Sequence, residues 1–408
     1  MRRGIRRILA YWRAERRTIA QGFVALLLAG FGSLVAGLAL GSITGTLEAL
    51  PGLMVMVPAA IGMRGNIFGA LGSRLGTSIH TGLYAPSRER EGILYQNVIA
   101  VTVLTLLISL LLAVLARTMS LAFGVDSISL ADFVVISILG GVLSSIVVGT
   151  FTVALSRAAY RREWDLDSVA APLVTAAGDM VTLPSLFLAT YLVGYPWVTP
   201  VTAALLAAFT IVLTVRVVRT DLSLTRRILR ESVPVLALAG AADVLAGLFI
   251  EARLDRFLIY PVLLVLIPPF LEAAGALGGI LSSRLGSKLH LGVLSPRGRP
   301  EAVAMLDATI VFLFAAAMFL LTGLAADGVA VLVGLASPGG WTVIGVSLLA
   351  GLMATVLSVA VAYYTAVATY RLGLDPDNHG IPMITSSMDV IGVVALIVAI
   401  TAFGLAGP

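Results

Sequence analysis

The sequence predicts an all-α integral membrane protein with about eleven transmembrane helices. Of its 408 residues, 59% are hydrophobic and 12% are charged, whereas about 25% of the residues in a soluble domain are charged. The apolar residues form long runs, most of them near the ~20 residues that a helix needs to cross a bilayer. Large parts of the chain also recur at one fixed spacing. Together these observations favour two parallel five-helix repeats, related by a pseudo-twofold axis along the membrane normal and joined by a linker helix.

The composition excludes several classes of site and partner. The chain contains no cysteine, so disulfides, thiolate metal sites and thiol nucleophiles are excluded. The sequence pI is near 9.7, but the basic residues stand in short clusters between apolar runs, which is typical of membrane-facing loops. We therefore expect the lipid bilayer, and no nucleic acid, as a partner.

The first 17 residues, MRRGIRRILAYWRAERR, form a basic segment of their own. They lack a short apolar core followed by a small-residue cleavage site, which a signal peptide would have. We expect residues 1–17 to be a retained cytosolic segment, amphipathic and able to lie on anionic lipid.

Five apolar segments follow in the first repeat, which we place at 18–193. They lie at 18–42, 48–84, 93–116, 131–158 and 168–193. A further apolar segment at 197–217, within residues 194–220, has no counterpart and is predicted to be the linker helix. The second repeat, 221–408, again contains five segments, at 231–252, 258–292, 302–324, 341–370 and 379–404.

Basic residues predict the orientation. With the N-terminus in the cytosol, 20 of the 27 Lys and Arg residues fall in cytosolic segments, three fall outside and four lie within or at the ends of spans. An excess of basic residues in cytosolic loops is the usual rule. Because the number of spans is odd, the C-terminus is expected on the extracytoplasmic side of the cell membrane.

The repeat appears when 210 is added to a residue number. Ten of the 25 positions from Pro58 to Gly82 are identical in the second copy, and no gap is needed. The same shift maps APLVTAAGD, at 171–179, onto IPMITSSMD, at 381–389. One offset that holds in two blocks a hundred residues apart indicates duplication.

Two aspartates are the most informative polar residues. If the fifth helix of each repeat begins about twelve residues earlier, Asp179 and Asp389 lie roughly 18 Å deep, near the middle of a ~30 Å hydrocarbon core. Carboxylates at that depth are expensive and by default functional. Thr175 and Thr385 lie one turn earlier on the same face. We predict that these four residues contact a transported cation.

The second segment of each repeat adds further candidates. It is rich in glycine and proline, and we expect a helix broken near Gly62–Gly65, which is tolerated only where backbone is buried in protein or lines a wet cavity; close packing through small residues is the alternative. Asn66 corresponds to Ala276, whereas Glu272 corresponds to Gly62. Each copy therefore offers one oxygen ligand, displaced by a turn.

The second half also places Asp243 in mid-span, where the first half has Ser33. Glu251, near the outer mouth, is expected to be a solvated carboxylate. Carboxylate, amide and hydroxyl oxygens favour hard cations such as Mg²⁺, Ca²⁺ and Mn²⁺. Mg²⁺ dehydrates reluctantly, so a wide site whose carboxylates contact the waters bound to the ion suits it.

These motifs resemble the membrane domain of the MgtE family of magnesium channels, and still more its duplicated relatives, the solute carrier family 41. The resemblance is carried by VPAAIGMRGNIFGALGSRLGTSIHTG, APLVTAAGD and IPMITSSMD and covers nearly the whole chain. It implies that this chain is similar to a dimer of five-span units fused into one, a pseudo-dimer that is itself monomeric or homodimeric. It also implies that Asp179 and Asp389 bind Mg²⁺, and that Gly65 and Asn66 match the Gly-Asn element of the family, which Ala276 breaks in the second copy.

Two other functions are compatible with some of these residues. AAGD, at 176–179, faintly resembles the Gly-Asp element of intramembrane aspartyl proteases, in which two aspartates share a proton. The second copy reads SSMD, and it lacks the glycine. A carrier of a small organic solute is the other alternative, although few aromatic or hydrogen-bonding residues lie at depth. We therefore expect a transporter and no enzyme.

Overall fold

The computed structural model describes residues 2–82, 84, 89–162, 166–373 and 380–405. Within these ranges the regular structure is entirely helical. Eleven of the helices in the described ranges are long and apolar enough to cross a membrane. The prediction of an all-α protein with about eleven spans is therefore confirmed.

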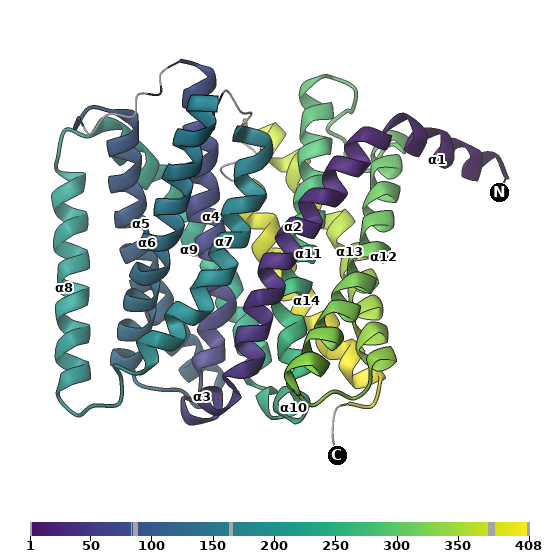
Figure 1. Ribbon diagram of the computed structural model, residues 1–408. Coiled ribbons are helices and arrows are strands. Elements are labelled where there is room, and N and C mark those ends of the chain that lie inside the picture. The colour runs from purple at the N-terminus through teal and green to yellow at the C-terminus, as the bar shows by residue number, and fades with distance from the viewer. Residues whose placement is uncertain (1, 83, 85–88, 163–165, 374–379, 406–408) are drawn as a thin grey trace. The chain divides into compact units, whose positions relative to one another are not determined.

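The helices fall into two compact units. The continuous unit, residues 42–254, holds α3 (Thr44–Ala49), α4 (Leu53–His80), α5 (Ile93–Phe123), α6 (Leu130–Arg162), α7 (Leu166–Thr190), α8 (Val198–Val218) and α9 (Ser223–Glu251). The split unit, residues 1–41 and 255–408, holds α1 (Arg2–Ala14), α2 (Arg16–Ser42), α10 (Leu254–Ile259), α11 (Val262–His290), α12 (Ala302–Val333), α13 (Gly340–Leu372) and α14 (Ile381–Ala402). Figure 1 shows the helices of both units.

The compact units cut across the repeats predicted at 18–193 and 221–408. With the shift of 210 residues, α2 is the counterpart of α9. However, α2 belongs to the same unit as α11–α14, and α9 belongs to the same unit as α4–α7. The continuous unit therefore combines α4–α7 of the first repeat with α9, the first long helix of the second repeat. The split unit combines α11–α14 of the second repeat with α2, the first long helix of the first repeat.

Matching glycines hold these exchanged helices in place. A Cβ atom added to Gly247 of α9 would overlap the backbone carbonyl of Val55 in α4. A Cβ atom added to Gly37 of α2 would overlap the carbonyl of Val265 in α11 in the same way. Shifted by 210 residues, Gly37 becomes Gly247 and Val55 becomes Val265. The same close approach of two backbones therefore occurs once in each unit. Small residues at such contacts are typical of membrane helices.

Replacing either glycine by alanine is expected to destabilise the protein. The added methyl group must push two backbones apart, and overpacking of this kind costs about 1–3 kcal/mol. Gly328→Ala in α12 is the matched control, since a Cβ there meets nothing within 4 Å, and alanine favours a helix by up to about 1 kcal/mol over glycine. The measurement is the melting temperature in detergent. Equal melting temperatures for Gly37→Ala, Gly247→Ala and Gly328→Ala would contradict the assigned contacts.

The expectation of a broken second helix is wrong. Both α4 and α11 are continuous, with Pro58 inside the first and Pro268 and Pro269 inside the second. Pro58 is the sixth residue of α4, and Pro268 and Pro269 are the seventh and eighth residues of α11. Each proline therefore removes one N–H donor near the start of its helix. Some of the glycines serve packing instead, since a Cβ on Gly278 would lie 2.7 Å from the side chain of Ile384.

Glu251 has a different role from the solvated carboxylate that we expected. Its two carboxylate oxygens accept hydrogen bonds from the backbone N–H groups of Gly52 at 2.7 Å and Met54 at 3.1 Å. These donors lie at the start of α4, where N–H groups have no partner within the helix. A carboxylate there also interacts favourably with the helix dipole. Glu251 therefore caps α4 and joins it to the end of α9.

Helix α8 lies at the outside of the continuous unit, against α6 and α5. Its apolar side chains point largely outward, as shown by Leu205 and Phe209, which are 66% and 57% exposed. In Figure 1 this helix stands at the left edge of its unit. An apolar face of this kind suits contact with lipid.

Candidate cation site

In the continuous unit, the site candidates gather where α7 crosses α4. Asp179 lies thirteen residues after Leu166, the first residue of α7, which corresponds to ~20 Å along the helix. Only 2% of Asp179 is exposed. A Cβ on its neighbour Gly178 would lie 3.5 Å from the Cβ of Arg64 and 3.9 Å from the backbone nitrogen of Gly65. The aspartate is therefore buried at mid-helix, next to the Gly-Asn pair of α4.

Thr175, one turn before Asp179 on α7, also packs against α4. A Cβ on Gly65 would lie 3.5 Å from Cγ2 and 3.9 Å from Oγ1 of Thr175. Asn66, the next residue on α4, is half-buried. The structure thus places Asn66, Thr175 and Asp179 on one helix crossing.

The split unit repeats the arrangement where α14 crosses α11. A Cβ on Gly275 would lie 3.5 Å from Cγ2 of Thr385, and one on Gly392 would lie 3.9 Å from the Cβ of Ala274. Asp389 lies between these two contacts along α14 and is half-buried. Glu272, also half-buried, stands one turn before Gly275 on α11. Glu272, Thr385 and Asp389 therefore share the second helix crossing.

Asp243 enters the continuous unit from a third helix. It is fully buried and lies on α9 between two glycines that approach neighbouring helices. A Cβ on Gly240 would lie 2.8 Å from Leu112 of α5, and Gly247 meets α4 as described above. The face of α9 that carries Asp243 is thus covered by α4 and α5.

The candidate residues supply oxygen ligands, but they do not form a complete coordination shell for a metal ion. Among the residues that the structure describes, no three His, Cys, Asp or Glu side chains are grouped so that they could hold a metal ion. Each helix crossing instead supplies one or two carboxylates together with a hydroxyl group. An ion that keeps several of its waters needs only one or two direct carboxylate ligands, so this chemistry suits a hydrated divalent cation.

A buried arginine beside the first crossing is held by hydroxyl groups. Arg64 is 1% exposed. Its guanidinium donates to Ser145 Oγ at 2.6 Å, Ser109 Oγ at 3.0 Å and Thr105 Oγ1 at 3.3 Å. The hydroxyls come from α5 and α6, and they satisfy donors that would be costly to leave unpaired in a membrane.

The second repeat fills the same place with apolar groups. Shifted by 210, Arg64 becomes Ala274 and Ser109 becomes Phe319. Phe319 is fully buried, and its ring would overlap a Cβ placed on Gly351. In the first repeat, a Cβ on the matching Gly141 would lie 2.9 Å from the Arg64 guanidinium. The guanidinium and the phenyl ring therefore occupy equivalent positions, and the paired changes at 64 and 109 were the signal in the sequence.

Comparison with known proteins agrees with the duplicated fold. The profile of the MgtE family, described as a divalent cation transporter, matches residues 57–189 and 267–399. These two ranges differ by 210 at both ends, which is the shift of the internal repeat.

Curated relatives match over nearly the whole chain. Solute carrier family 41 member 3 of Rattus norvegicus is 25% identical over 92% of this chain and 85% of its own length. The Mus musculus protein of the same name is 27% identical over 91% and 80%, and solute carrier family 41 member 2 of Xenopus laevis is 25% identical over 93% and 71%. No solved structure matches.

These matches decide between the functions that the sequence left open. The protein is a transporter and not an aspartyl protease, and its cargo is a divalent cation and not a small organic solute. The two halves that match the family profile are the two copies of one duplicated unit, and they include Asp179 and Asp389 at equivalent places. The chain belongs to the MgtE family of divalent cation transporters.

Proposed function

We propose that the protein transports Mg²⁺ across the cell membrane and that Asp179 and Asp389 contact the ion. Asn66, Thr175 and Asp243 in the continuous unit, and Glu272 and Thr385 in the split unit, are proposed as further oxygen ligands to the ion or to its waters. The ion is the cargo of the protein and not a resident cofactor.

One observation carries this proposal. In both units the aspartate of the last repeat helix lies where that helix packs against a glycine of α4 or α11, through Gly65 and Thr175 or through Gly275 and Thr385. A carboxylate placed twice in the same packed, mid-membrane setting is expensive. Attraction of a cation offsets that cost.

The two crossings differ in the ligands that surround the aspartate. The first supplies an amide, Asn66, next to the fixed positive charge of Arg64. The second supplies a second carboxylate, Glu272, with Ala274 in place of the arginine. The split unit therefore attracts a cation more strongly, and we propose that Glu272 takes the place of the missing asparagine at Ala276.

The choice of ion is tested in proteoliposomes that contain the purified protein and an internal Mg²⁺ indicator. We expect Mg²⁺ flux that is inhibited by external Mn²⁺ more than by Ca²⁺, because Mn²⁺ is closer to Mg²⁺ in size and geometry. Liposomes without protein give the background. A flux of Ca²⁺ or Mn²⁺ without any flux of Mg²⁺ would refute the choice of ion but not the family.

We also propose that the N-terminus lies in the cytosol and the C-terminus outside. The chain has no cysteine of its own, so single cysteines report the topology without background. Gly298→Cys, in the exposed loop before α12, is expected to react with an impermeant thiol reagent only after the cells are opened. Ala336→Cys, in the exposed loop after α12, is expected to react in intact cells. The reverse pattern would invert the proposed orientation.

A further inference from the structure

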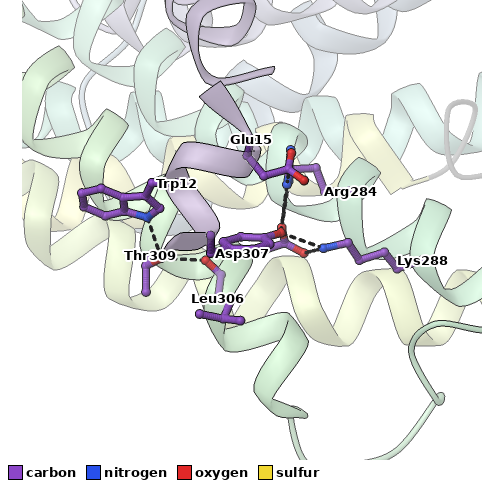
Figure 2. Close-up of polar contacts among 8 residues, drawn as sticks. Trp12, Glu15, Arg284, Lys288, Leu306, Asp307 and Thr309 are labelled. Atoms are coloured by element: carbon purple, nitrogen blue, oxygen red, sulfur yellow. Dashed lines mark hydrogen bonds and ion pairs between the residues drawn. The ribbon is translucent and has the colours of Figure 1, made fainter. Parts of the chain in front are cut away.

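The N-terminal helix is fastened to the split unit by a buried carboxylate. Asp307 of α12 has no exposed side-chain surface, and it accepts hydrogen bonds from the Tyr11 hydroxyl at 2.7 Å and the Arg284 Nε at 2.9 Å. Lys288 Nζ lies 2.5 Å from its other oxygen, and Arg284 also reaches Glu15 at 3.1 Å. Figure 2 shows how residues of α1, α11 and α12 converge here. We call Tyr11, Glu15, Arg284, Lys288 and Asp307 the latch.

A second contact fixes the same face of α1. The indole Nε1 of Trp12 donates to the hydroxyl of Thr309 on α12 at 3.0 Å. Trp12 follows Tyr11 and precedes Glu15 by three residues, so all three side chains lie on one side of the helix. This side, which we call the inner face of α1, is half-buried.

The continuous unit has a counterpart of the latch that lacks the carboxylate. Shifted by 210, Arg284, Lys288 and Asp307 become Arg74, Ser78 and Asn97. Arg74 Nε donates to Asn97 Oδ1 at 2.8 Å, so the geometry is kept, but the carboxylate and the lysine are absent. The charged form of the contact thus occurs in the unit that holds α1, which indicates that the charges serve to hold this helix.

The opposite side of α1 is strongly basic and faces solvent. Arg6 and Arg13, seven residues apart, lie on this side. Arg7 is exposed at the Tyr11 edge of the helix, and the exposed Arg16 and Arg17 follow at the start of α2. The only acidic residue from 2 to 17 is Glu15, which is already bound to Arg284. Leu9, 46% exposed, adds an apolar group at the edge of this basic face.

The position of α1 determines what can meet the basic face. Only Glu15 separates α1 from α2, which is long and apolar enough to span the membrane, so α1 must lie at the membrane surface. Figure 1 shows α1, in purple, leaving the end of α2 and extending past α12. A basic amphipathic helix at this level meets lipid headgroups, and the charge of its face is complementary to anionic ones.

We propose that the basic face of α1 is a binding surface for anionic phospholipid, and that the latch couples lipid binding to α11. Lipid on the outer side holds α1 against the unit, and the inner face then holds Arg284 and Lys288. Arg284 lies twelve residues after Glu272 on the same helix, ~18 Å away. The effect on transport rests on the proposed function of Glu272, but lipid binding itself does not.

The test compares the full-length protein in nanodiscs of phosphatidylcholine with an increasing fraction of phosphatidylglycerol. The melting temperature is expected to rise with the anionic fraction, and the rise should disappear at high salt. The variant R6Q/R7Q/R13Q should lose most of the rise. The matched control is R226Q/R227Q/R230Q, which removes three exposed arginines from the start of α9, the counterpart of α2. Equal loss in both variants would show a general charge effect and overturn the proposal.

A second variant separates binding from coupling. The double variant K288S/D307N reproduces the arginine, serine and asparagine of the continuous unit at the equivalent positions, so the protein is expected to fold. It should still bind anionic vesicles in a flotation assay, but its melting temperature should no longer respond to phosphatidylglycerol. An unchanged response would overturn the coupling. A soluble polyanion such as polyglutamate that stabilises the wild type as much as the lipid does would overturn the choice of phospholipid as the ligand.

Discussion

Asp179→Asn is expected to abolish Mg²⁺ flux, and Asp389→Asn is expected to reduce it strongly, while both proteins remain folded. Asparagine keeps the size of the side chain and most of its hydrogen bonds, but it removes the charge. Two unit charges 4 Å apart attract each other by about 4 kcal/mol near a protein surface, and the ion carries two charges. A loss of even ~3 kcal/mol corresponds to roughly 100-fold weaker binding. Flux in proteoliposomes is the measurement.

The control for this experiment is Asp126→Asn. Asp126 lies in the exposed turn between α5 and α6, so its charge is screened by water and its loss should leave flux unchanged. Melting temperatures and gel-filtration profiles establish that each variant is folded. Wild-type flux in both Asp179→Asn and Asp389→Asn, with normal folding, would remove the two aspartates from the ion path.

The two aspartates are not expected to behave identically. Asp179 is buried beside Arg64, whereas Asp389 is half-buried and shares its crossing with Glu272. The remaining carboxylate of the split unit, Glu272, can retain part of the attraction in Asp389→Asn. We therefore expect some residual flux in that variant, and its removal by the further change Glu272→Gln.

Hydropathy and the internal repeat were sufficient to predict the spans and the pairing of motifs. The apolar runs are long, and the shift of 210 residues places Asp179 and Asn66 in the same relation as Asp389 and Ala276. Side chains that pack against a neighbouring helix recur in both copies of the repeat. The repeat therefore indicates which residues face a neighbouring helix. It predicted that Asn66, Thr175 and Asp179 contact a cation, and it did not indicate that they share one helix crossing.

The exchange of α2 and α9 could not be predicted in this way. Both helices are apolar and contain glycine at matching positions, Gly37 and Gly247, so either one fits against α4 or α11 by sequence alone. The prolines and glycines of the second helix led to the wrong prediction of a broken helix for a related reason. They permit a break, but here Pro58 lies near the start of α4, and in α11 the glycine Gly278 serves a close contact with Ile384.

The hydroxyl cradle of Arg64 leads to the second large effect. In the second repeat the matching space is filled by Phe319, beside Ala274. The backbone is equivalent in both places, since the Ser137 hydroxyl donates to the carbonyl of Ser109 at 2.7 Å and the Ser347 hydroxyl donates to that of Phe319 at the same distance. An alanine at position 64 and a phenylalanine at position 109 should therefore pack in the first repeat as Ala274 and Phe319 do in the second.

Three variants test this equivalence as a double-mutant cycle. Arg64→Ala should lower stability by about 2–5 kcal/mol, as large-to-small changes in a packed core do. Ser109→Phe should also destabilise, because its ring would meet the guanidinium that now lies 3.0 Å from the serine oxygen. R64A/S109F should recover most of both losses, since the ring fills the space left by the arginine against Gly141. Melting temperatures of the four proteins give the coupling energy. Additive losses would mean that the guanidinium and the phenyl ring do not occupy equivalent space, and that the packing of the two repeats differs where their sequences do.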